Sequence, residues 1–310
     1  LIGEIELRNG EVGNAYAVLL EAARRTREES LFKRSIEVAL QARAGDQALA
    51  AARAWRQTLP QSLEARRYEL QLLAALNRSA EVGEPLKLLL ARTPEAERAD
   101  LIATLPRLFQ RTPDKRQAAS LIEELLQPYT QATHTPPTRT AAHVSSGRAW
   151  WLAGESARAL DHAERAVADD PGAAGPVLLA IDLMSKSPDA ETLVTEHLRR
   201  PDADLGVQLA YVRALSSAQR YVDAIAQLKI ITRNKPELAA SWLSLGALQL
   251  VLRASREAES SLQRFLAVHA SATSVVAAKS DDDDDDDDES GRGGDGGQTQ
   301  AWLMLAQAAD

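Results

Sequence analysis

Cysteine is absent from this sequence of 310 residues. Its absence excludes disulfide bonds, thiolate metal ligands and cysteine nucleophiles, but it does not fix the cellular compartment. Aromatic residues make up only 4% of the chain, and alternating runs of Val, Ile, Thr and Tyr are nearly missing. The sequence therefore gives little reason to expect β-strands. No apolar run approaches the roughly 18 residues that a membrane-spanning helix requires.

The chain also lacks a stripe of basic residues. Its formal net charge is −8, from 36 basic and 44 acidic residues. Asp281 to Asp288 and Glu289 supply nine of the acids, so the rest of the chain, with 36 basic and 35 acidic residues (44 − 9), is nearly neutral. A phosphate backbone needs clustered positive charge, so nucleic acid is not an expected partner.

Signals of catalysis are missing too. The glycine-rich segment 291–297 lacks the Lys-Ser/Thr of a phosphate-binding loop, and Ser145 and Ser146 fall in a predicted helix, away from any nucleophile elbow. The five histidines have no metal-binding spacing, and we interpret each as a surface or helix-packing residue. These histidines are His134, His143, His162, His197 and His269. We expect no enzyme activity, no cofactor and no metal site.

What the sequence does contain is a helical repeat. Hydrophobic residues make up 45% of the chain, mostly alanine and leucine, which suit closely packed helices. Pro60, Pro94 and Pro128 are 34 residues apart, and Pro171 and Pro236 continue the series with altered spacing. Each follows an amphipathic stretch, so we expect each to end a second helix and begin the turn to the next unit.

Small residues recur at matching positions of these units. A small residue on each helix of a pair lets the two backbones approach closely. The predicted close-approach residues are Gly3 with Ala15, Gly147 and Gly246 on first helices, and Ala48, Ala159, Ala224 and Ala258 on second helices.

These residues resemble the consensus of the tetratricopeptide repeat (TPR) family. The best copy holds Trp242, Leu245-Gly246, Ala258 and Leu262, with Ala270 in place of the closing proline. The resemblance covers nearly the whole chain. It implies an all-α fold, a TPR-like α-α superhelical solenoid of antiparallel helix pairs, whose function is to bind a protein or peptide.

The repeat divides the chain into five parts. We expect about four repeats in 1–130, a Thr/Pro-rich loop at 131–139, about four repeats in 140–272, an acidic and Gly-rich insertion at 273–297, and the first helix of a further repeat at 298–310. The loop should not be helical, and the two halves could hinge there. Pro106 should interrupt the first helix of the fourth repeat.

The insertion 273–297 is predicted to be disordered. Its like charges repel one another, and its glycines make ordering costly. A run of aspartates does not preset the spaced oxygen ligands of a calcium site, so a solvated loop is favoured over a specific cation site at Asp281 to Asp288.

The TPR resemblance implies that first helices line a concave binding face. Positions carried over unit by unit give a mixture of charges that suits a polypeptide ligand. They are Lys33, Glu37, Arg67, Gln71, Arg148, Trp151, Asp182 and Arg213. A merely solvated helix face is the alternative for each. Trp150 is expected in the core, and Trp151 either faces the groove or packs against the next unit.

The opening stretch carries a second resemblance, to proteobacterial TPR lipoproteins of the outer membrane. The segments that carry it are Gly3-Glu4-Ile5, Arg8-Asn9-Gly10-Glu11, Ala15-Tyr16, Leu19, Ala22 to Arg27, Ala48 and Ala51 to Trp55. The best-described kind is a periplasmic adaptor that binds a carboxyl-terminal processing protease and presents cell-wall hydrolases to it. The resemblance implies the same partners and location for this chain.

Two other functions remain open from the sequence, a cytoplasmic or inner-membrane assembly scaffold and an enzyme with an unrecognised active site. The chain starts at Leu1 without an initiator Met and ends one helix into a repeat. We therefore expect it to be part of a longer protein, in which a signal peptide or a lipid-bearing Cys would lie outside this sequence.

Overall fold

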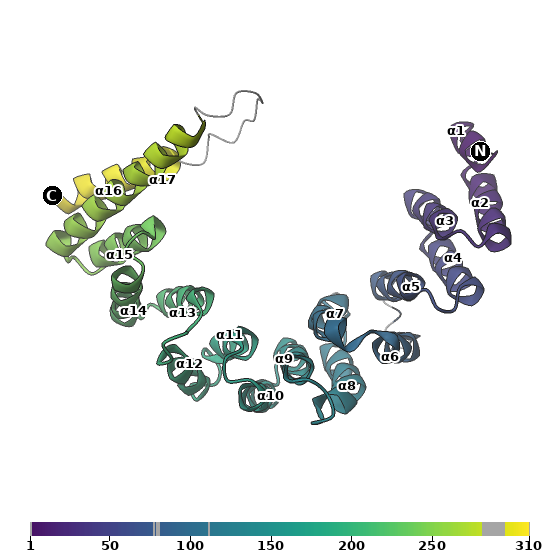
Figure 1. Cartoon of the computed structure of the whole chain (residues 1–310), viewed down its shortest axis with the longest axis horizontal. Helices are drawn as coiled ribbons and strands as arrows, with labels where there is room; N and C mark the ends of the chain where they lie inside the picture. The colour runs from purple at the N-terminus through teal and green to yellow at the C-terminus, as the bar shows by residue number, and fades with distance from the viewer. Residues whose placement is uncertain (1, 77, 79–80, 111, 281–294, 310) are drawn as a thin grey trace. The chain divides into compact units, whose positions relative to one another are not determined.

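The fold is all-α. The computed structural model describes residues 2–76, 78, 81–110, 112–280 and 295–309, and it contains no β-strand over these residues. The chain divides into two compact units, Leu1–Leu193 and Val194–Asp310. In each unit successive helices form antiparallel pairs, and the pairs stack in chain order as a TPR-like α-α solenoid (Figure 1).

In the first unit, from the third pair to the sixth, the first helices of neighbouring pairs also contact one another. The first helices are α1 (Ile2–Arg8), α3 (Glu29–Gln41), α5 (Leu63–Ala75), α7 (Glu95–Leu108), α9 (Pro136–Leu152) and α11 (Ala174–Leu183). The second helices are α2 (Val12–Thr26), α4 (Gly45–Thr58), α6 (Gly83–Arg92), α8 (Lys115–Leu126), α10 (Ser156–Asp169) and α12 (Ala190–Leu198), in which the unit ends.

The second unit holds two further pairs and a last helix. They are α13 (Leu205–Ser217), α14 (Tyr221–Asn234), α15 (Ala239–Val251), α16 (Ser255–Ser280) and α17 (Asp295–Ala309). One hydrophobic cluster of this unit consists of Leu262, Phe265 and Ala301, with Trp242 among the side chains packed around them. None of the described helices is both long and apolar enough to cross a membrane.

The prolines end the second helices as predicted. α4 ends at Thr58 and α6 at Arg92, just before Pro60 and Pro94. Pro128 follows the end of α8 and lies in a short 3₁₀ turn, Gln127–Thr130. α10 and α14 stop two residues before their prolines. A residue that cannot donate to the helix ladder therefore separates these units.

Three of the glycines on first helices lie where two backbones meet. A Cβ added to Gly147 would lie 2.6 Å from Leu179 Cδ2 and 3.2 Å from the backbone oxygen of Ala159. At Gly246 it would lie 2.7 Å from Leu262 Cγ and 3.4 Å from the oxygen of Ala258. Both predicted Gly–Ala pairs are confirmed. Gly3 repeats the geometry, with Leu19 Cγ at 2.7 Å and the oxygen of Ala15 at 3.4 Å.

In five of the pairs the turn between the two helices contains one residue in the left-handed region. Its φ is +82° at Gly10 and +81° at Gly154, but 58° at Arg43, 60° at Gln219 and 58° at Arg253. A side chain is strained in this region and glycine is not. Three pairs therefore keep the turn despite an unfavourable residue.

The predicted loop at 131–139 is shorter in the structure, because α9 begins at Pro136. Pro136 and Pro137 occupy the first turn of α9, where a missing N–H costs nothing and the fixed φ suits a helix. The predicted hinge at this segment is wrong too. The first unit continues to Leu193, and α9 packs against both α7 and α8.

Pro106 does not interrupt α7, which runs through it to Leu108. A proline at 106 leaves the backbone oxygen of Ile102 without its usual helical donor. The hydroxyl of Ser145, on α9, donates to that oxygen at 2.8 Å. The neighbouring helix thus replaces the hydrogen bond that the proline removes.

The predicted disorder of 273–297 is wrong at both ends. α16 extends to Ser280, and α17 starts at Asp295. Residues 273–280 are mainly Ser, Val, Ala and Lys without glycine or proline, so nothing in them breaks the helix. Residues 281–294, with the aspartate run, lie outside the described residues.

Candidate functional site

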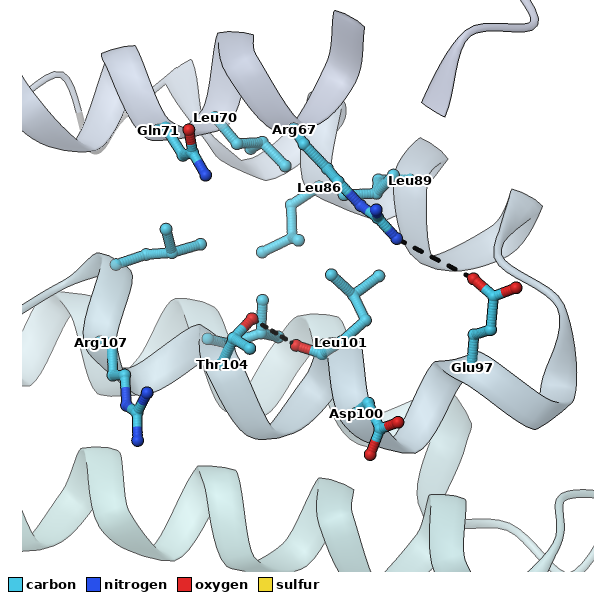
Figure 2. A pocket seen from close by; sticks show the side chains of 12 residues that line it. Arg67, Leu70, Gln71, Leu86, Leu89, Glu97, Asp100, Leu101, Thr104 and Arg107 are labelled. Carbon is cyan, nitrogen blue, oxygen red and sulfur yellow. Dashed lines mark hydrogen bonds and ion pairs between the residues drawn. The ribbon is translucent and has the colours of Figure 1, made fainter. Parts of the chain in front are cut away.

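A hollow of about 510 Å³ opens between α5 and α7 in the first unit (Figure 2). Leucines from three helices form its floor and walls. Leu70 comes from α5, Leu86 and Leu89 from the second helix α6, and Leu101 and Leu105 from α7. We call this hollow, with its charged rim, the α5–α7 groove. Apolar walls with a few polar groups at the edge are typical of binding sites.

Charged side chains stand at the two ends of the groove. At one end Arg67 and Glu97 face each other at 4.0 Å, with Asp100 beside them (Figure 2). At the other end lies Arg107, and Gln71 lies on the opposite wall. All five of these side chains are exposed. The rim therefore offers both signs of charge around an apolar interior.

Two of the sequence-predicted binding residues, Arg67 and Gln71, line this groove. All eight predicted residues lie on first helices, as the repeat register required. Their role in binding stays a prediction, and the other six do not line this groove.

Lys33 and Glu37, on α3, are already engaged within the chain. Lys33 Nζ lies 2.7 Å from Glu64 Oε1 and 5.9 Å from the centre of the Trp55 ring. The hydrogen bond to Glu64 raises the pKa of Lys33. Glu37 pairs with Arg34 at 3.1 Å. A ligand at these two positions would compete with existing ion pairs.

Arg148 on α9 and Asp182 on α11 lie on neighbouring first helices. The Nε atom of Arg148 is buried and has no hydrogen-bond partner. Protein packed around the Asp182 carboxylate raises its pKa by desolvation, although the residue is exposed at the surface, and the charge of Arg148 opposes this rise. Trp151, one turn from Arg148, is half-buried.

Trp150 belongs to the core, as predicted, with 1% of its surface exposed. Its indole N–H donates to Glu123 Oε2 at 3.1 Å, and the Arg158 guanidinium stacks 4.1 Å from the ring centre. Arg213, on α13, is exposed and lies in the second compact unit.

Sequence reasoning missed the α7 wall of the groove. Leu101, Leu105 and Leu108 stand at i, i+4 and i+7, the spacing of one helix face. Asp100 and Arg107 flank this leucine stripe on the same helix. The signal was present in the sequence, but the fourth repeat matches the consensus poorly, so no groove positions were carried over to it.

The structure also joins two histidines that looked scattered. Nδ1 of His143 lies 3.2 Å from Nδ1 of His162, and both side chains are buried. His162 Nε2 lies 3.2 Å from Glu123 Oε1, and His143 Nε2 lies 3.7 Å from Asp169 Oδ2. Glu123 therefore favours the proton on Nε2 of His162, so that its Nδ1 accepts and His143 Nδ1 donates.

Burial shifts both histidines in the same direction. Desolvation, together with the charge of a protonated His162, lowers the pKa of His143 to about 4 against the pull of Asp169. Desolvation also lowers the pKa of His162, against the hydrogen bond to Glu123. The pair is therefore neutral near pH 7. No group of three or more His, Asp or Glu side chains among the described residues could hold a metal ion.

No protein-family model and no curated protein matches this sequence. Solved structures resemble it in fold. Naa15/Naa10 bound to HypK-THB shares 13% identity over 98% of this chain and 52% of that one, with a TM-score of 0.44. Yeast Tom70 shares 12% over 99% and 74%, with a TM-score of 0.39.

A tetratricopeptide repeat protein from Parabacteroides merdae shares 9% identity over 90% of this chain and 98% of its own, with a TM-score of 0.36. The chain spans about half the length of the matched Naa15/Naa10 chain. At these identities and TM-scores the likenesses assign neither a family nor a function to this chain.

Proposed function

We propose that this chain is a non-catalytic scaffold that binds a segment of a partner protein in the α5–α7 groove. The observation that carries this proposal is the apolar hollow itself, which opens between the first helices α5 and α7 and is rimmed by exposed charges of both signs. A partner bound there would bury apolar side chains at the centre of the contact and place polar groups around its rim. Protein interfaces have this arrangement.

The chemistry of the lining favours binding over catalysis. None of the twelve residues that line the groove is a histidine, serine, cysteine or lysine. The single hydroxyl, on Thr104, donates to the backbone oxygen of Leu101 at 2.7 Å. A nucleophile beside a general base, the arrangement that acyl or phosphoryl transfer requires, is not among these side chains.

A steric block tests the proposal. Thr104 is exposed at the groove, so Thr104→Trp should fill the hollow without disturbing the core. Ala103 is exposed on the same helix and does not line the groove, which makes Ala103→Trp the matched control. Proteins captured from an extract of the source organism by the unchanged chain should be lost with Thr104→Trp and kept with Ala103→Trp. Equal capture by both variants contradicts a role for the groove.

We further propose that the partner is a carboxyl-terminal processing protease, or a cell-wall hydrolase delivered to it, and that the protein works in the periplasm on the outer membrane. The support is the resemblance carried by segments such as 3–5, 8–11 and 51–55. The expected result is faster hydrolase cleavage by the purified protease when the chain is added.

Unchanged cleavage, together with no binding to either protein, would contradict the adaptor proposal but not the general scaffold proposal. Cell fractionation and the upstream gene sequence then decide between compartments. A lipoprotein signal upstream of Leu1 supports the periplasm. An upstream membrane helix, or no export signal, supports the alternative of a cytoplasmic or inner-membrane scaffold without a protease partner.

A further inference from the structure

The buried floor of the α5–α7 groove is formed by leucine side chains, which offer no hydrogen-bond partner to a backbone. Leu86, Leu89 and Leu105 are buried apolar side chains, and the Thr104 hydroxyl already bonds within α7. An extended segment laid on this floor would lose water from its backbone N–H and C=O groups without replacement, which is costly. A helix satisfies these groups internally, so the floor selects a helical ligand.

The walls have the shape that a helix needs. α5 and α7 run in the same direction along the groove, since Arg67 faces Glu97 and the later residue Gln71 lies towards the Arg107 end (Figure 2). A third helix can place a ridge of side chains between two such helices, and leucine-type residues at i, i+4 and i+7 form that ridge.

The charges of the rim set a direction. Asp100 and Arg107 are exposed, and neither forms an ion pair with a residue that the structure describes. Seven residues of helix separate them, about 10 Å. At the Asp100 end the Arg67–Glu97 pair cancels, which leaves one negative charge, while Arg107 leaves one positive charge at the other end.

We propose that the α5–α7 groove binds an amphipathic helix of the partner, with its N-terminal end at Asp100 and its C-terminal end at Arg107. The groove polarity matches the positive N-terminus and negative C-terminus of a helix. A basic residue before the leucine ridge meets Asp100, and an acidic residue after it meets Arg107. This inference rests on the proposed function and adds the chemistry of the bound segment.

Two synthetic peptides of equal composition test the direction. Both carry leucines at i, i+4 and i+7 on an alanine-rich helix. The first has lysine before the ridge and glutamate after it, and the second has the two charges exchanged. The first order opposes the dipole of the peptide helix itself, so the first peptide is not the more helical in isolation. A preference for it therefore reports the groove.

Binding of each labelled peptide to the full chain is measured by fluorescence anisotropy. The first peptide should bind about fivefold more tightly, as two exposed charge pairs allow. The double variant Asp100→Lys with Arg107→Glu should reverse the preference, and salt at about 0.5 M should reduce it because the pairs are exposed. Thr104→Trp should abolish binding of both peptides, and Ala103→Trp should leave it unchanged.

Equal binding of the two peptides, or binding of neither, overturns the inference. These results are distinct from failure of the scaffold. If Thr104→Trp removes captured proteins while the peptides fail to bind, the scaffold proposal is supported and the proposal of a helical ligand is contradicted. If the peptides bind with the expected preference while no protein is captured, the helix-binding groove is supported and the scaffold proposal is contradicted.

Discussion

At the scale of single residues, close helix packing in this chain depends on positions without a side chain. Gly147 and Gly246 lie within 3.4 Å, measured from an added Cβ, of the backbone of the facing helix. Gly13, in contrast, has nothing within 4 Å of such a Cβ. The same residue type is therefore required at one place and replaceable at another.

Gly147→Ala should destabilise the first unit by about 1–3 kcal/mol, because the added methyl group overlaps Leu179 and approaches His162 and Ala159. Gly13→Ala should be neutral or stabilising by up to about 1 kcal/mol, because it adds helix propensity in open space. Urea unfolding followed by circular dichroism compares the two. Equal effects of the substitutions would show that the contact at Gly147 relaxes freely.

Arg253→Gly should stabilise the second unit by roughly 0.5–1 kcal/mol, because φ of 58° strains any side chain and glycine relieves it. Gly154→Ala, at the matching turn of the first unit with φ of +81°, should have the opposite sign. Thermal unfolding of both variants measures this. Destabilisation by Arg253→Gly would mean that the arginine side chain contributes more than the strain it causes.

The buried histidine pair makes stability depend on pH. The pKa of His143 is about 4 in the folded chain and near 6.5 when unfolded. Below about pH 6.5 the unfolded state binds a proton that the folded state refuses, so stability is full above that pH and falls by up to about 3 kcal/mol towards pH 4. His162, whose pKa is also lowered, acts in the same direction.

His143→Gln should flatten this fall, although it lowers stability at neutral pH by removing the hydrogen bond to His162. Urea unfolding of both proteins at about pH 7 and about pH 4.5 separates the histidine effect from the titration of carboxylates common to both. A slope that is unchanged in the variant would assign the acid sensitivity to other groups.

At the scale of helices, one carboxylate ties α7 to the start of α9. Glu95 Oε1 accepts the backbone N–H of Thr135 at 3.1 Å and its hydroxyl at 3.0 Å, and Glu95 Oε2 lies 3.2 Å from His134 Nδ1. Desolvation raises the pKa of Glu95, but hydrogen bonds from Thr138, Thr135 and His134 outweigh it and lower this pKa to about 2. This cluster holds the short connection before α9 in place.

Glu95→Ala should cost the first unit about 1–2 kcal/mol, because it removes several hydrogen bonds to a charged group that is only partly buried. The region around residues 131–135, which contains no Lys or Arg, should then be cleaved faster by a protease of broad specificity such as proteinase K. Glu84→Ala, an exposed glutamate on α6, is the control and should change neither property. Unaltered cleavage in Glu95→Ala would show that packing of α9 alone orders the connection.

The helix pairs were predictable because proline and small residues recur at one period and act locally. The places where the structure departs from the prediction could not be predicted, because they depend on contacts between residues far apart in the sequence. Ser145 replaces the hydrogen bond lost at Pro106, and Glu95 fixes the residues before Pro136. The candidate groove was half predictable. Arg67 and Gln71 follow from the register, whereas its α7 wall lies in a repeat that fits the consensus poorly.

At the scale of the whole molecule, the surface is nearly neutral apart from the acidic run, so apolar patches matter for association. On α17, Trp302 and Leu303 are 62% and 68% exposed. Trp242 instead packs against the core of the second unit, and its indole N–H donates to the oxygen of Pro236 at 2.9 Å. The two tryptophans therefore contribute differently to stability and to solubility.

Trp302→Ser should leave the unfolding free energy nearly unchanged and reduce self-association at high concentration, because it removes an exposed apolar side chain. Trp242→Ser should lower stability by about 2–4 kcal/mol. Light scattering and urea unfolding measure the two properties. A large loss of stability in Trp302→Ser would show that this indole packs against the protein in solution.

The number of residues from each packing glycine to the left-handed residue in the turn of the same pair constrains how the chain can change in length. It is seven residues in three pairs, from 3 to 10, from 147 to 154 and from 246 to 253. One inserted residue would rotate the turn by about 100° relative to the packing site. We therefore expect related chains to differ in length at the connections between pairs, and not between these two positions.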